Sequence, residues 1–165
     1  MTHGNGQEPL LRRAMLALVM LGAAGLSVEL ILLEHYEDPW QWAPLALLAT
    51  ALVTGALVAW RRTRGTVAAF RAVMLLCVVS GAVGTWLHYA GNAEFERERD
   101  ATLRGVAFFW ETVRGATPTL APAAMAQLGL LGLLWSWRLP LRAPATAVPE
   151  PHSQPLPAPL RTERT

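Results

Sequence analysis

The chain has 165 residues, of which 53% are hydrophobic and only 16% are charged. Soluble domains carry about 25% charged residues, so this composition indicates an integral membrane protein. The arginines behind the net charge of +2 flank apolar runs. Because they do not cluster on one soluble face, the positive charge does not indicate a nucleic-acid-binding surface. The single cysteine, Cys77, excludes an intrachain disulfide and a CxxC motif.

Four apolar runs are long enough to cross a bilayer as helices, which takes roughly 20 residues each. A cleaved signal peptide is the alternative for the first run, but that run exceeds the 7–15-residue core of a signal peptide. We therefore predict an all-α, four-transmembrane-helix bundle over residues 14–138, preceded by an N-terminal tail at 1–13. The predicted spans are 14–33, 43–60, 72–90 and 120–137.

The orientation follows from the charges of the short connections. Segment 61–71 contains four arginines and no acid, whereas segment 34–42 contains three acids and no Lys or Arg. Because basic loops stay in the cytoplasm, the first segment is predicted to be cytoplasmic and the second to lie outside. We expect a multi-pass protein of the bacterial inner (plasma) membrane with both termini in the cytoplasm.

Two further segments flank the fourth span. Stretch 100–114 has apolar residues at helical spacing, with Asp100 to cap its start and Gly115 to end it. It is predicted to form a short amphipathic helix in the second outer loop, on the membrane surface or over the mouth of the bundle. Segment 139–165 is rich in proline and is predicted to be a disordered cytoplasmic tail.

A weak internal similarity links the first and third spans. Ranges 22–29 and 81–88 share the spacing of two glycines and one ionisable residue, which suggests a duplicated helical hairpin. These positions fall on one helical face, and small residues allow helices to approach closely. We therefore expect the two faces to meet and to bring Glu29 against His88.

This pairing predicts a polar site near the outer mouth of the bundle. An ionisable group inside a span costs about 2.5–3.5 kcal/mol and is a candidate for function. The alternative is a Glu29–His88 hydrogen bond that only holds two helices together. The predicted binding residues are Glu29, His88, Asn92, Glu37 and Glu96, and the predicted metal ligands are Glu29, His88 and His35.

Imidazole and carboxylate ligands suit a divalent transition metal, although no established metal-binding spacing is present. Haem between His88 and His35 is less favoured, because the two residues lie at different depths. The sequence therefore does not identify a cofactor.

The sequence favours a membrane module that binds or transports a cation, a metal or a proton. The alternative is a non-catalytic accessory or assembly subunit of a larger membrane complex, and a redox subunit is least favoured. Hydrolase motifs are absent from the sequence, so an enzyme is less expected. The expected partners are the lipid bilayer and either a second copy or another membrane protein, but not nucleic acid.

Overall fold

The computed structural model describes residues 7–139 and 141, and this part of the chain is all-helical, without strands. Helices α1 to α3 are long and apolar enough to cross a membrane, which confirms the helical membrane class. Helix α5 is apolar but shorter. The elements are α1 (Gln7–Leu32), the 3-10 turn η1 (Pro39–Gln41), α2 (Trp42–Trp60), α3 (Arg64–Arg99), α4 (Gly105–Val113) and α5 (Ala123–Ser136).

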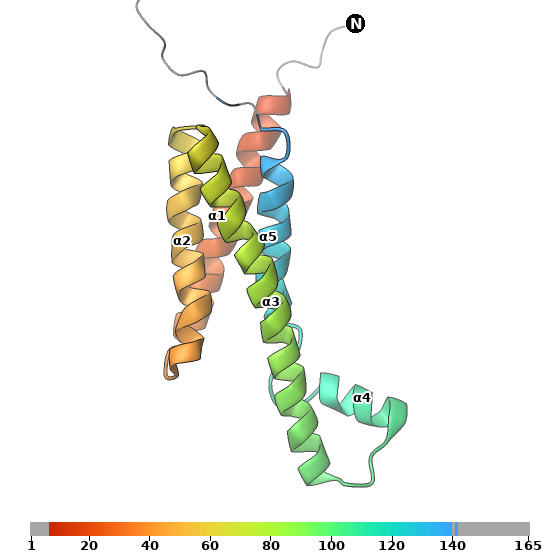
Figure 1. Ribbon diagram of the computed structural model, residues 1–165. Helices are drawn as coiled ribbons and strands as arrows, with labels where there is room; N and C mark the ends of the chain where they lie inside the picture. Colours follow the sequence, from red (N-terminus) through yellow and green to blue (C-terminus); the bar gives the residue numbers. More distant parts are fainter. Residues whose placement is uncertain (1–6, 140, 142–165) are drawn as a thin grey trace, which may run out of the picture.

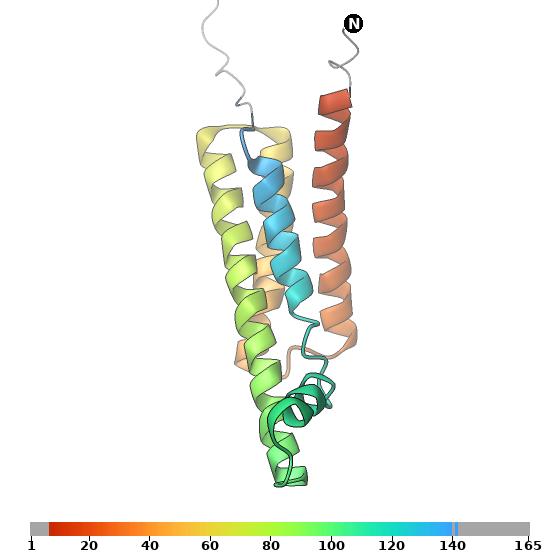
Figure 2. The same ribbon diagram turned by 90° about the vertical axis from the view of Figure 1, so that its right-hand side faces the viewer.

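Four of the helices lie side by side, and α5 lies between α1 and α3 (Figures 1 and 2). Helix α3 packs on α2 and α5, while α1 packs on α2 and α5 but not on α3. The start of α1, the α2–α3 connection and the end of α5 lie at one end of the bundle (Figure 1). The α1–α2 connection lies at the opposite end.

Helix α3 is much longer than the predicted span 72–90. Its start is capped by Thr63, whose Oγ1 accepts a hydrogen bond from the Thr66 backbone N–H at 3.2 Å. It continues to Arg99 because segment 91–99 is rich in Glu and Arg, which favour helix without being apolar. The helix therefore extends past its apolar part.

The two predicted tails have different outcomes. The N-terminal tail predicted at 1–13 is helical from Gln7, because Pro9 in the first turn of α1 is compatible with a helix start. The disordered tail predicted at 139–165 lies outside the described residues, apart from residues 139 and 141.

Helices α4 and α5 are shorter than the sequence predicts. Helix α5 begins after turns that end at Pro122, and it stops before Arg138, which has a left-handed φ of 51°. Helix α4 begins only at Gly105, within the predicted stretch 100–114. Asp100 does not cap it: its Oδ1 accepts hydrogen bonds from the N–H and Oγ1 of Thr102, at 2.8 and 2.6 Å, and ends α3 instead.

Helices α3 and α5 approach each other through glycines. A Cβ atom on Gly81 would lie 2.4 Å from the Ala126 nitrogen, and one on Gly129 would lie 2.4 Å from the Met74 carbonyl oxygen. Neither position has room for a side chain, so glycine is required for the contact. The glycines of range 81–88 do face inward, but toward α5 rather than α1.

The arginine-rich end of the bundle is joined by polar contacts. Trp135 packs edge-on against Phe70, with ring centroids 5.3 Å apart, and its Nε1 donates to the Arg12 carbonyl at 2.7 Å. The Arg71 guanidinium donates to the hydroxyl and the carbonyl of Ser136. These contacts link α1, α3 and α5 at one level.

Replacing Gly81 with Ala is expected to destabilise the bundle by about 1–3 kcal/mol, because the added methyl group meets the α5 backbone. Thermal unfolding of the purified chain in detergent measures the effect. The matched control is Gly25→Ala on α1, where a Cβ meets nothing within 4 Å. That control should gain up to about 1 kcal/mol from helix propensity; equal loss in both variants would contradict the close α3–α5 approach.

Candidate functional site

Glu29 does not reach the centre of the bundle. Its side chain is exposed on α1, and it has no hydrogen bond or ion pair with His88 among the described residues. The predicted Glu29–His88 pair is therefore not formed. Glu29 stands alone on the outer surface of its helix.

The reason is that α1 presents a different face to the bundle. Val19 and Ala23 are buried. In contrast, Leu18 is 63% exposed, and Gly25 is exposed as well. Of the two glycines in range 22–29, Gly22 approaches α5, where a Cβ would lie 2.8 Å from a Leu128 methyl group, whereas a Cβ on Gly25 would meet nothing within 4 Å. The expected meeting of the two glycine faces is wrong, because α5 separates α1 from α3.

His88 lies beside the segment that connects α4 to α5. Its Nδ1 is 3.0 Å from the Pro118 carbonyl oxygen, so a ring with the proton on Nδ1 donates to that carbonyl. The side chain is half-buried. His88 thus contacts a backbone group rather than a carboxylate.

Asn92, one turn further along α3, is the centre of a buried polar network. It is 2% exposed, and its Oδ1 accepts from the backbone N–H and the hydroxyl of Thr117, at 3.0 and 2.7 Å. Its Nδ2 lies within hydrogen-bonding distance of the carbonyls of Thr112 and Thr117 and of the Thr119 hydroxyl, at 3.1, 2.7 and 3.0 Å. Both polar atoms of the amide are therefore engaged within the protein.

Glu96 lies one further turn along the same face of α3 and is 4% exposed. Its Oε2 accepts from Nε and NH2 of Arg99, at 2.9 and 2.6 Å. Glu111 of α4 lies 4.0 Å from the same guanidinium and extends the ion pair toward α4. The predicted binding residues His88, Asn92 and Glu96 are thus brought onto one face, where they hold the loop and α4.

His35 and Glu37 follow the end of α1. Glu34 takes a left-handed φ of 54°, and the His35 N–H donates to the Leu30 carbonyl at 2.8 Å, a hydrogen bond of the Schellman type. This turn directs the chain back and leaves His35 half-buried. Glu37 is exposed, and its side chain joins no polar cluster among the described residues.

The structure gathers no set of three or more His, Cys, Asp or Glu side chains that could hold a metal ion, within residues 7–139 and 141. Glu29, His88 and His35, the predicted metal ligands, are accordingly not brought together as such a set. A haem site between His35 and His88 stays a prediction.

The threonines around Asn92 were not predicted. Thr112 and Thr119 are buried, and they and Thr117 come from the α4–α5 region, 20 to 27 residues away along the chain. Their only sequence signal is the run of small polar residues near Pro118, which also fits an ordinary loop. We call Asn92 with Thr112, Thr117 and Thr119 the Asn92 network.

Comparison with protein-family models, with curated proteins and with solved structures finds no match for this chain. Fold and site therefore define the class directly: a helical membrane protein with a polar network at one end of its longest helix.

Asn92→Ala is expected to release segment 105–119 while leaving the helix bundle folded. It removes hydrogen bonds at one buried position, which costs about 2 kcal/mol or more. Hydrogen–deuterium exchange of the full chain in detergent should show roughly tenfold or faster exchange in this segment. Gln127→Ala, an exposed amide on α5, is the control and should leave exchange there unchanged; unaltered exchange in Asn92→Ala would count against the network.

The stability of the protein should depend on the protonation of His35. Burial, and secondarily the positive charge of His88, lower the pKa of His35 from its ordinary value of 6.5. The folded state disfavours protonated His35. The contribution of this residue to the free energy of unfolding is therefore complete above about pH 6.5, and it is lost as pH falls through the lower pKa of the folded state. Thermal unfolding between about pH 7.5 and about pH 5 should show a smaller loss in His35→Asn than in the wild type; identical losses would refute the environment assigned to His35.

Proposed function

We propose that α5 is a fourth membrane span, although it has only 14 residues. The contacts of α5 with α3 support this assignment. A Cβ on Gly84 would lie 2.8 Å from the Pro122 side chain, and one on Gly132 would collide with the sulfur of Met74. Helix α5 thus runs along the apolar part of α3 and shares its depth.

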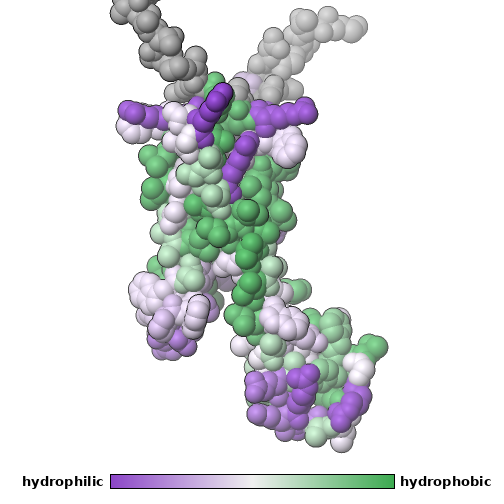
Figure 3. Space-filling view, viewed as in Figure 1, coloured by the Kyte–Doolittle hydropathy of each residue, from purple (hydrophilic) through white to green (hydrophobic). Residues whose placement is uncertain are grey.

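The proposed orientation places the arginine-rich end in the cytoplasm. Figure 3 supports it with an apolar band between two hydrophilic ends. The upper end, where α1 starts and α5 stops, carries basic residues, as expected for a cytoplasmic face. The α1–α2 connection and α4 then face outward, to the periplasm if the membrane is a bacterial inner membrane. The basic residues at the cytoplasmic end are Arg12, Arg13, Arg61, Arg62, Arg64, Arg71 and Arg138.

A structured projection would then stand on the outer side. Helix α3 has 36 residues and is about 54 Å long, whereas the apolar core of a bilayer is about 30 Å thick. Its final part extends beyond the other helices and carries α4 beside it (Figure 1). We define residues 91–119, from the end of α3 through α4 to the following loop, as the outer projection.

We propose that the protein is a non-catalytic accessory or assembly subunit that presents the outer projection to another membrane protein. The observation that supports this function is the Asn92 network, which uses its buried amide to fix a loop rather than to bind a ligand. Arg99, which is paired with Glu96, adds a partly exposed ion pair to Glu111 of α4 at 4.0 Å. A buried network that is fully paired rigidifies a surface, which suits a recognition element.

One observation favours the transport-type alternative. His35 and His88 come from different helical hairpins, and the charge of His88 contributes to the lowered pKa of His35, after burial. Two electrostatically coupled imidazoles would suit proton or cation transfer, with Glu29 as a separate group on α1. The duplicated hairpin stays a prediction in either case.

The accessory function predicts a stoichiometric partner that depends on the outer projection. The tagged full chain is purified from its native membrane in mild detergent, as wild type and as Glu94→Lys/Glu98→Lys, which reverses two exposed charges on the projection. We expect the variant to lose the partner at least tenfold, because reversed charges oppose a complementary surface.

The matched control is Glu37→Lys, which makes the same type of change at an exposed position of the other outer loop. It should retain the partner. A wild-type chain that purifies alone, with stoichiometric metal that is lost in both His35→Ala and His88→Ala, would instead support the transport-type alternative.

A further inference from the structure

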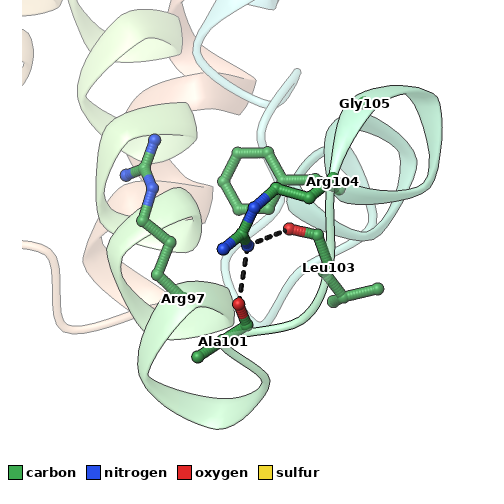
Figure 4. Close-up of a pocket in the computed structure, with 6 residues that line it drawn as sticks. Arg97, Ala101, Leu103, Arg104 and Gly105 are labelled. Atoms are coloured by element: carbon green, nitrogen blue, oxygen red, sulfur yellow. Dashed lines mark hydrogen bonds between the residues drawn. The ribbon is translucent and has the colours of Figure 1, made fainter.

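A hollow of about 450 Å³ lies between the end of α3 and the start of α4, within the outer projection (Figure 4). Two of its lining residues are arginines from different elements, and no acidic side chain lines it. The lining residues are Arg97, Ala101, Leu103, Arg104, Gly105 and Phe108.

The Arg104 guanidinium is held in place by the backbone. One terminal nitrogen, NH1, donates to the carbonyls of Ala101 and Leu103, each at 2.6 Å (Figure 4). The other N–H groups of this guanidinium have no acceptor among the described residues. The group is therefore fixed, with donors left over.

The Arg97 guanidinium is placed by packing. It lies over the Phe108 ring, 4.8 Å from the ring centroid, and its side chain runs back along α3 (Figure 4). Within the described residues it has neither a hydrogen bond nor an ion pair. A cation in this state retains its full capacity to bind an anion.

The start of α4 adds a third positive contribution. Arg104 is the N-cap residue and supplies no side-chain cap, and Gly105 follows in the lining of the hollow. Uncapped N–H groups at a helix start attract negative charge. Asp100 precedes the hollow, but its carboxylate accepts from Thr102 and forms no ion pair with either arginine in the described chain.

The surroundings of the hollow suit the surface of a membrane. Val106, Phe109 and Trp110 of α4 are 84%, 52% and 54% exposed. Phe109 lies beside Tyr89, with ring centroids 6.1 Å apart, near the end of the apolar part of α3. In Figure 3 this region is hydrophobic on the side toward the bundle and hydrophilic on the far side, as in a helix at a lipid interface.

We infer that Arg97 and Arg104 bind the phosphate group of a phospholipid headgroup in the outer leaflet. Guanidinium groups match phosphate oxygens in geometry and charge, and the aromatic residues of α4 contact the adjoining acyl region. The inference goes beyond the proposed function and rests only on the membrane placement of α4. Loss of a protein partner would leave it intact, so the two proposals fail separately.

Native mass spectrometry of the full chain in detergent tests this site. The probe is phosphatidylglycerol, and diacylglycerol with the same acyl chains is the phosphate-free comparison. We expect the wild type to retain the first lipid and not the second. Arg97→Gln should weaken retention about tenfold, the usual loss for one charge-assisted contact.

Arg114→Gln removes the same charge at the other end of α4 and is the matched control, with no change expected. Circular dichroism checks the fold, and Arg97→Lys, which keeps the charge, serves as the second variant and should retain part of the affinity. Equal retention by the wild type and Arg97→Gln, or equal binding of diacylglycerol, would falsify the site. Inorganic phosphate that binds without lipid and displaces the phospholipid would overturn the lipid as the source of the phosphate.

Discussion

The close approach of α3 and α5 is the constraint on which the arrangement of this protein depends. Gly81 meets the backbone of α5, and Gly129 meets the backbone of α3, so at each contact a glycine of one helix lies against the backbone of the other. In a membrane, where apolar burial gives little drive for association, such contact is a main source of helix packing. It makes α5 the neighbour of α3 and excludes α1 from that place.

The placement of α5 beside α3 determines which segments pack on the final turns of α3. With α5 beside α3, the chain that leads into α5 must return along α3, and it brings its threonines to Asn92. Arg99, which pairs with Glu96 on α3, also lies 4.0 Å from Glu111 and so links α4 to the same surface. The polar residues on this face thus support a folded element at the end of α3, where an isolated helix end would fray.

Glu29 and His88, which were predicted to form a pair, have different surroundings because α5 lies between their helices. His88 faces the chain that enters α5, whereas Glu29 lies on a helix that contacts α2 and α5 through another face. Spacing along α1 placed Glu29 in line with two glycines, yet both Gly25 and Glu29 are exposed. The pattern grouped residues that share a face of α1, but that face does not pack into the bundle.

The sequence by itself determined the class of protein and its all-helical character, because length and apolarity of a span are local properties that follow from bilayer thickness. It also located the apolar parts of the long helices, although not the polar turns that extend them. In addition, it singled out Asn92 and Glu96 as candidate site residues. Only the tertiary structure decided that α5 separates α1 from α3, that Asn92 binds the loop, and that Arg97 and Arg104 line one hollow. Helix periodicity specifies which residues share a face, but the partner of that face depends on contacts between segments distant in the chain.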